Sequence, residues 1–267
     1  MGIASDILAD RDAAWAALQW LQELGAVDPV GDAPLDRYDL AEPVREAAPE
    51  PRRPAAATEP AAMPAPRLDP VVVARDAALR AATLEALSEA MAAYPHCDLR
   101  KGARNTVFAD GNPKARVMII GEAPGRDEDM QGLPFVGRAG QLLDRMFSAI
   151  GMGRDSPDTE SALYITNVLP WRPPSNRDPA PEEMAMMVPF LIRHVELADP
   201  EVIVVMGNTP AMAVLRQRGI TRLRGNWTQA WGKPVLPMLH PAYLLRNPYA
   251  KRDAWADLLV LQARLRG

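Results

Sequence analysis

Three short segments of the sequence hold residue types that could do chemistry on a planar, polar ligand. The first runs from Gly121 to Gly140 and contains Glu122, Glu128 and Phe135. A carboxylate can place a water molecule, an aromatic ring can stack on a flat ligand, and glycines let the backbone approach a ligand closely. Phe135 could equally be a core anchor, and the acidic residues could be the solvated face of a turn.

The other two segments each follow an apolar run. Asn167 lies near the end of one such run, and its amide can both donate and accept hydrogen bonds to a base edge or bond to its own backbone. His240 directly follows residues 234–239, where a histidine can stabilise a developing anion or simply cap the strand end. Leu244 and Leu245 could wedge into a base stack as an exposed apolar pair, or lie in the core.

The elements that must position these residues alternate between strands and helices. Apolar runs predict strands at 115–120, 163–169, 202–206 and 234–239, and helical spacing predicts helices over 71–93, 140–150, 181–197, 210–216 and 252–264. This alternation predicts an α/β fold with a mostly parallel sheet covered by helices on both faces. Ligands in such folds gather at the carboxyl ends of strands, which is where all three segments fall.

The N-terminal quarter of the chain has a different composition. Residues 1–40 are expected to form a small helical appendage, with a helix over 5–25. Residues 41–70 are rich in Pro, Ala, Glu and Arg and poor in large apolar side chains, so we expect a disordered linker. Residues 71–267 then form the main domain.

Composition limits the class of protein and its partners. The 267 residues are 48% hydrophobic, and no long apolar stretch or targeting segment appears, so a soluble, cytoplasmic protein without a membrane partner is expected. The formal net charge of −4 argues against nucleic acid, but residues 202–252 contain no Asp or Glu and carry eight Arg or Lys side chains. Because phosphate binding needs only a local positive surface, this stretch favours a polyanion partner.

Four segments, read in order, resemble family 4 of the uracil-DNA glycosylases. They are Gly-Glu-Ala-Pro-Gly at 121–125, Gly-Leu-Pro-Phe-Val-Gly-Arg-Ala-Gly at 132–140, Arg-Pro-Pro-Ser-Asn-Arg-Asp-Pro at 172–179 and His-Pro-Ala-Tyr-Leu-Leu-Arg-Asn-Pro at 240–248. The resemblance covers about Asp98 to Leu265. It implies a three-layer α/β/α sandwich with a central four-stranded parallel sheet, and a monofunctional base-excision repair enzyme. Such an enzyme flips uracil out of DNA and hydrolyses its N-glycosidic bond, stabilising the leaving uracil anion and leaving an abasic site.

The same resemblance implies a role for each candidate residue. Phe135 would stack on the flipped base, Asn167 would bind its edge, and His240 would stabilise the leaving anion. Glu122 and Glu128 would line the pocket and place water, and Ala123 stands where other branches of the superfamily have a water-activating Asp or Asn. Contacts to DNA are expected from Leu244, Leu245, Arg246, Arg172 and Arg177.

The sequence departs from the family at the cofactor. Typical members hold a four-iron cluster with four cysteines, and these positions correspond to Tyr94, Cys97, Trp171 and Met187. Because Cys97 is the only cysteine of the chain, we expect the iron–sulfur cluster to be absent and no other metal or cofactor to replace it. Trp171 and Met187 are expected to pack into the space of the cluster.

Other functions stay open at this stage. A non-catalytic protein of the same fold could bind uracil or damaged DNA, and an interaction protein could recruit a partner through its N-terminal arm. A dinucleotide-binding enzyme is disfavoured because no Gly-x-Gly-x-x-Gly follows the first strand. The expected partner is uracil-containing DNA, single- or double-stranded, bound by a monomer.

Overall fold

The computed structural model describes residues 69–267. The expected appendage of residues 1–40, its helix over 5–25 and the linker as far as residue 68 lie outside the described residues. Within residues 69–267, none of the helices has the length and apolar character needed to cross a membrane.

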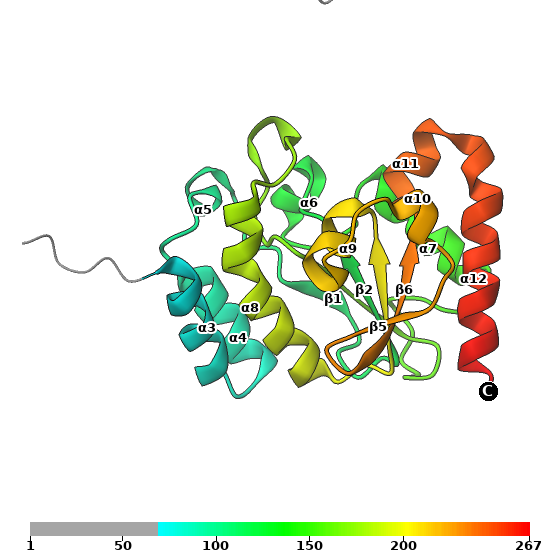
Figure 1. Cartoon of the computed structure of the whole chain (residues 1–267), viewed down its shortest axis with the longest axis horizontal. Helices are drawn as coiled ribbons and strands as arrows, with labels where there is room; N and C mark the ends of the chain where they lie inside the picture. The colour runs from blue at the N-terminus through cyan, green and yellow to red at the C-terminus, as the bar shows by residue number, and fades with distance from the viewer. Residues whose placement is uncertain (1–68) are drawn as a thin grey trace, which may run out of the picture. The chain divides into compact units, whose positions relative to one another are not determined.

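A six-stranded mixed sheet runs through the described part of the chain (Figure 1). Its strands are β1 (Ala109–Gly111), β2 (Val117–Gly121), β3 (Leu163–Asn167), β4 (Val202–Met206), β5 (Thr228–Ala230) and β6 (Lys233–Met238), in the order β1-β3-β2-β4-β6-β5. Strands β3, β2, β4 and β6 pair in parallel, whereas β1 and β5 pair antiparallel at the edges. The expected four-stranded parallel sheet is therefore corrected to a mixed sheet of six. Its two edge strands have only three residues each and form no apolar run that a sequence pattern could detect.

The two central strands, β2 and β4, are buried along their whole length because helices cover both faces of the sheet. In β2, Met118 and Ile120 join one buried cluster, while Val117 and Ile119 join another on the opposite face. Helices α8 (Pro181–Ala198) and α9 (Asn208–Leu215) contribute to the first cluster. Helices α7 (Arg138–Ser148) and α12 (Lys251–Leu265) supply the helical residues of the second. All four helices lie within a few residues of their predicted ranges.

The helix predicted over 71–93 is wrong as a single element. The chain instead forms α3 (Pro70–Arg80) and α4 (Leu84–Ala93). Ala81 is extended, and the Thr83 hydroxyl accepts a hydrogen bond from the Ala86 amide, which caps a new helix. Both helices pack with α8 around a third buried cluster, which also contains Tyr94, Cys97, Trp171 and Met187.

Several short elements occupy the connections between the strands. They are α5 (Leu99–Gly102), α6 (Arg126–Gln131), the 3-10 turn Pro174–Asn176, α10 (Ile220–Leu223), α11 (Pro241–Arg246) and the 3-10 turn Pro248–Ala250. None of these regions falls within a helix predicted from the sequence. Both α6 and α11 directly follow the carboxyl ends of strands and help to shape the cavity described next.

Candidate active site

One cavity of about 330 Å³ opens where the loops after β2, β3 and β6 meet at the carboxyl edge of the sheet. This volume lies in the range of small-molecule sites, roughly 300–1,000 Å³. Of the predicted site residues, it is lined by Glu122, Ala123, Glu128, Phe135, Asn167, Arg177, His240 and Arg246. Segments more than 100 residues apart in the sequence therefore contribute to one site.

A glycine at the end of β2 makes room for two of these side chains. Gly121 pairs with Asn167 across the sheet. A Cβ atom added to Gly121 would lie 2.4 Å from the Asn167 Oδ1 atom and 2.5 Å from the Phe135 ring. No larger residue could stand there without displacing one or both of them, so Gly121 fixes where the amide and the ring meet.

The Asn167 amide opens on the cavity. The residue is only 7% exposed. Its side-chain amide makes no hydrogen bond to another of the described residues. Every fully buried side-chain polar atom of these residues does have a hydrogen-bond partner, so the Asn167 amide is not fully buried. The amide must therefore reach the cavity, where it can offer one donor and one acceptor side by side to a ligand.

His240 is the N-cap residue of α11, and it lines the cavity. Its Nδ1 atom accepts a hydrogen bond from the Ala242 amide at 3.1 Å, so the neutral ring carries its proton on Nε2. Burial, with the nearby positive charge of Arg246, lowers the pKa of His240 to about 4. The imidazole is therefore neutral near pH 7, and it stacks on the Phe135 ring with the centroids 5.5 Å apart.

Phe135 is held in an unusual backbone conformation. Its φ is +53°, in the left-handed region that residues with a side chain seldom adopt. Gly140 in the first turn of α7 packs directly against it, because an added Cβ would lie 1.7 Å from the Phe135 carbonyl oxygen. The surrounding chain therefore determines the position of the ring, which is 5% exposed.

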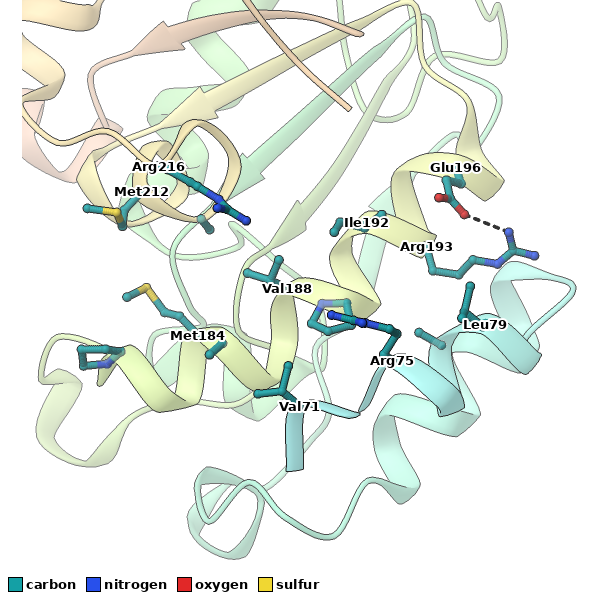
Figure 2. A pocket seen from close by; sticks show the side chains of 15 residues that line it. Val71, Arg75, Leu79, Met184, Val188, Ile192, Arg193, Glu196, Met212 and Arg216 are labelled. Atoms are coloured by element: carbon teal, nitrogen blue, oxygen red, sulfur yellow. Dashed lines mark hydrogen bonds and ion pairs between the residues drawn. The ribbon is translucent and has the colours of Figure 1, made fainter. Parts of the chain in front are cut away.

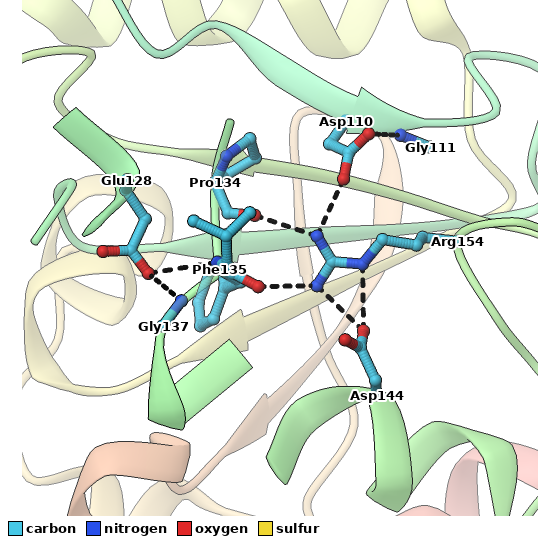
Figure 3. A network of polar contacts seen from close by, with 9 residues as sticks. Asp110, Gly111, Glu128, Pro134, Phe135, Gly137, Asp144 and Arg154 are labelled. Carbon is cyan, nitrogen blue, oxygen red and sulfur yellow. Dashed lines mark hydrogen bonds and ion pairs between the residues drawn. The ribbon is translucent and has the colours of Figure 1, made fainter. Parts of the chain in front are cut away.

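The two predicted carboxylates have different surroundings. Glu128 accepts hydrogen bonds from the backbone amides of Gly125, Val136 and Gly137 at 3.0–3.1 Å. Figure 3 shows the two that come from the loop after Phe135. The Glu128 carboxylate is thus engaged in holding the loop that carries Phe135. Glu122 accepts one hydrogen bond, from the Thr209 hydroxyl at 2.6 Å, and lines the cavity. Thr209 was missed because its segment, after β4, contains no residue type that signals chemistry on its own.

The residues of α11 that were expected to contact DNA differ in their exposure. Arg246 lines the cavity, but Leu244 is fully buried in the core. The expectation of an exposed pair is therefore corrected: Leu244 lies on the inner side of α11, and Leu245 is half-buried against the same cluster.

The basic residues of the loop after β3 have partners within the protein. Arg172 donates to Asn176, and Arg177 forms an ion pair with Glu183. The sequence also missed Tyr249, which follows α11 and is 98% exposed. A lone tyrosine in a Pro-Tyr-Ala turn carries no pattern that could have indicated its exposure.

A larger cavity, of about 600 Å³, lies elsewhere, between α3, α8 and α9 (Figure 2). Its lining is mainly apolar, with Val71, Leu79, Met184, Val188 and Ile192 among the side chains shown. It contains none of the predicted site residues, and its one carboxylate, Glu196, is paired with Arg193. The smaller cavity is therefore the better candidate for a reaction site.

Comparison with known proteins identifies several uracil-DNA glycosylases as relatives. The chain is 42% identical over 170 residues to a type-4 uracil-DNA glycosylase of Archaeoglobus fulgidus, covering 60% of this chain and 82% of the relative. It is 40% identical over 169 residues to a type-4 uracil-DNA glycosylase of Thermotoga maritima, covering 61% and 84%. A type-5 uracil-DNA glycosylase of Pyrobaculum aerophilum is 30% identical over 149 residues, covering 51% and 66%.

These relatives correct the expectation that the protein has no cofactor. Type-4 uracil-DNA glycosylases are known iron–sulfur enzymes, so that expectation is withdrawn. The residues of this chain do not themselves show cluster binding. Cys97 is the only cysteine, and the neighbouring Tyr94 hydroxyl and Trp171 indole donate to Pro70 and Thr106. This set of side chains does not match four thiolates, and no step proposed below depends on a cluster.

Among the described residues, no group of three or more His, Cys, Asp or Glu side chains is placed to hold a metal ion. A model of the uracil DNA glycosylase superfamily matches residues 108–259, which is more than half of the chain. The matched region contains every residue that lines the cavity at the carboxyl edge of the sheet. The chain belongs to the uracil DNA glycosylase superfamily.

Proposed function

We propose that this protein is a monofunctional uracil-DNA glycosylase of base-excision repair. It binds uracil-containing DNA, takes the uracil nucleotide out of the base stack and hydrolyses its N-glycosidic bond, leaving an abasic site. The observation that carries this proposal is the convergence of Phe135, Asn167 and His240 on one cavity large enough for a single base. The type-4 relatives support the same activity.

Recognition of the base follows from two of these side chains. The Phe135 ring stacks on the face of uracil. The Asn167 amide oxygen accepts a hydrogen bond from the uracil N3–H group, while the Asn167 NH₂ group donates a hydrogen bond to the O4 carbonyl. Cytosine presents an acceptor at N3 and an amino group at C4, so the same amide orientation would meet it with two mismatched groups.

Hydrolysis follows from stabilising the departing base. As the glycosidic bond breaks, negative charge develops on uracil while the sugar becomes cationic. The Nε2–H group of the neutral His240 ring donates a hydrogen bond to the uracil oxygen that gains charge, in a site where burial strengthens the interaction. Glu122, held by Thr209, positions the attacking water, and the small Ala123 side chain leaves room for it.

Glu128 has a positioning role in this proposal. Its three backbone hydrogen bonds leave it little capacity to take part in proton transfer, and they fix the loop on which Phe135 lies. DNA is contacted by Arg246, Leu245 and the exposed Tyr249, and by Arg172 and Arg177 of the loop after β3. That the protein acts as a monomer stays a prediction.

The finer description of the fold belongs to the same proposal. The parallel strands β3, β2, β4 and β6 form the centre of a three-layer α/β/α arrangement, supported by α8 and α9 on one face and by α7 and α12 on the other. A protein partner for the N-terminal arm and a cytoplasmic location stay predictions.

The test is excision from a labelled oligonucleotide that contains one uracil, followed by alkali to cleave abasic sites. Wild type should excise, and Asn167→Ala and His240→Ala should each lose on the order of 100-fold or more in rate. The exposed His96 lies outside the cavity, so His96→Ala is a matched control that should keep full activity. Tight binding of uracil-containing DNA without cleavage would favour the second candidate, a non-catalytic binding protein.

A further inference from the structure

Arg154 lies outside the cavity but contacts the loop that carries Phe135. It follows α7 in the sequence, and its side chain is only 10% exposed. One terminal nitrogen donates to the Pro134 carbonyl and the other to the Phe135 carbonyl, both at 2.9 Å (Figure 3). The guanidinium plane thereby fixes the orientation of two consecutive peptide groups.

Two carboxylates hold the guanidinium itself in place. Asp110 accepts from it at 2.8 Å and Asp144 at 2.8–2.9 Å. Asp110 comes from β1 and Asp144 from α7, so Arg154 connects an edge of the sheet, a helix and the loop. Because every arm of the planar group has an acceptor, lysine could not reproduce the arrangement.

The opposite side of the loop is held by a negative charge. Glu128 accepts from the amides of Val136 and Gly137, directly after the two carbonyls that Arg154 binds. The Arg154 cation therefore fixes the carbonyls of residues 134 and 135, and the Glu128 anion fixes the amides of residues 136 and 137. Between them Phe135 adopts its left-handed conformation, which an unrestrained residue with a side chain would avoid.

We propose that Arg154 is a positioning residue, which holds the Phe135 ring in the orientation that stacks on the flipped pyrimidine. This inference rests on the proposed function of the cavity. Arg154 acts through Phe135 and does not touch the substrate. Its removal lets residues 134–137 relax, so the ring no longer lies parallel to the plane in which Asn167 binds the base.

The test is a double-mutant cycle between Arg154→Lys and Phe135→Leu. Each single variant should lose roughly tenfold to 100-fold in single-turnover excision, as expected for misplacement by about 1 Å. The double variant should lose no more than Phe135→Leu alone, because Arg154 has no further effect once the ring is gone. Losses that multiply, or a folded Arg154→Lys protein within twofold of wild type, would overturn the proposal.

Arg116→Lys is the matched control. Arg116 is also partly buried, and it also binds two carboxylates and a carbonyl, those of Glu160, Glu201 and Leu265. It directly precedes β2 and so lies at the amino end of that strand, away from the cavity. Its replacement should lower the melting temperature to a similar extent while leaving excision unchanged.

A second measurement separates this proposal from the proposed activity. Binding of an oligonucleotide with 2′-fluoro-2′-deoxyuridine, which resists cleavage, reports base stacking without turnover. Arg154→Lys should weaken this binding by the same factor as Phe135→Leu, and Arg116→Lys should not weaken it. If wild type binds the probe but excises nothing, hydrolysis is refuted while Arg154 is still judged by the binding data. If Arg154→Lys does not fold, Asp144→Asn, which loosens the same guanidinium, should show the same non-additivity with Phe135→Leu.

Discussion

At the scale of single residues, stabilisation of the leaving base depends on His240, a histidine that stays neutral. Burial and the charge of Arg246 lower the pKa of His240 to about 4, and its Nδ1 atom is occupied by the Ala242 amide. A neutral ring can still donate from Nε2 to a developing anion, and it does not attract counter-ions in the free enzyme. The lowered pKa therefore suits a site that must stabilise charge only when the glycosidic bond breaks.

The dependence of the excision rate on pH should reflect the lowered pKa of His240. Because the neutral form of His240 predominates above pH 4, the single-turnover rate should show no inflection near pH 6.5, the ordinary value for histidine. The rate should fall only as the pH approaches about 4, where protonation of Nδ1 breaks the hydrogen bond from Ala242. An inflection near pH 6.5 that disappears in His240→Gln would contradict this assignment.

The two glutamates of the site should respond differently to removal. Glu128→Ala leaves three backbone amides without their acceptor, so the free energy of unfolding should fall by about 3 kcal/mol. Glu122→Ala removes one hydrogen bond with Thr209 and should cost about 1 kcal/mol, while excision falls in both variants. Urea denaturation and excision assays measure the two effects. A Glu128→Ala protein as stable as wild type but inactive would point to direct participation in the reaction.

Residue types alone could identify most members of the site but not what their atoms do. Asn167 and His240 were predictable because each lies at the end of an apolar run, where strands deliver side chains to a ligand. The engagement of Glu128 by backbone amides was not predictable, because it depends on how residues 125, 136 and 137 converge in space. Arg154 lies between the motifs that end at Gly140 and begin at Arg172, and has no pattern of its own.

At the scale of elements, burial explains which parts of the fold the sequence predicted. Strands β2, β4 and β6 are covered on both faces and appear as continuous apolar runs. The edge strands β1 and β5 and the short helices α6 and α11 have too few residues for an apolar period to indicate them, and they depend on tertiary contacts for their stability. The burial of Leu244 follows from α11, which places it on the inner side of the helix four residues after His240.

Packing between α7 and the Phe135 loop yields a prediction at this scale. Gly140→Ala places a Cβ atom 1.7 Å from the Phe135 carbonyl, a contact that only a shift of the helix or the loop can relieve. The unfolding free energy should fall by about 1–3 kcal/mol, and excision should fall with it. Gly102→Ala, in α5 with no atom within 4 Å of the added Cβ, is the control and should affect neither. Full excision by Gly140→Ala would mean that the ring position tolerates movement of α7.

Over the whole molecule, charge is distributed to favour DNA despite the net charge of −4. The basic stretch 202–252 is less available than its sequence indicates, because Arg224 pairs with the buried Asp257 and Lys233 pairs with Asp199. Six basic side chains of this stretch form no ion pair within residues 69–267, namely Arg216, Arg218, Arg222, Arg246, Lys251 and Arg252. A small number of phosphate contacts is therefore expected.

The dependence of DNA binding on salt should reveal these contacts. Each phosphate neutralised on a single strand contributes about −0.7 to the slope of log K against log salt concentration, so a binding site of this size should give a slope of roughly −2 to −4. Arg246 lines the cavity and has no ionic partner among the described residues, so Arg246→Ala should weaken binding and reduce the slope by about 0.7 to 1. Arg266 is exposed and directly follows α12. The C-terminal end of α12 lies at the bottom of the view in Figure 1 and α11 at the top, so Arg266→Ala should leave the slope unchanged. If the two substitutions change the slope equally, long-range charge, and not contact at the cavity mouth, attracts the DNA. If only Arg246→Ala changes the slope, the DNA strand lies beside His240.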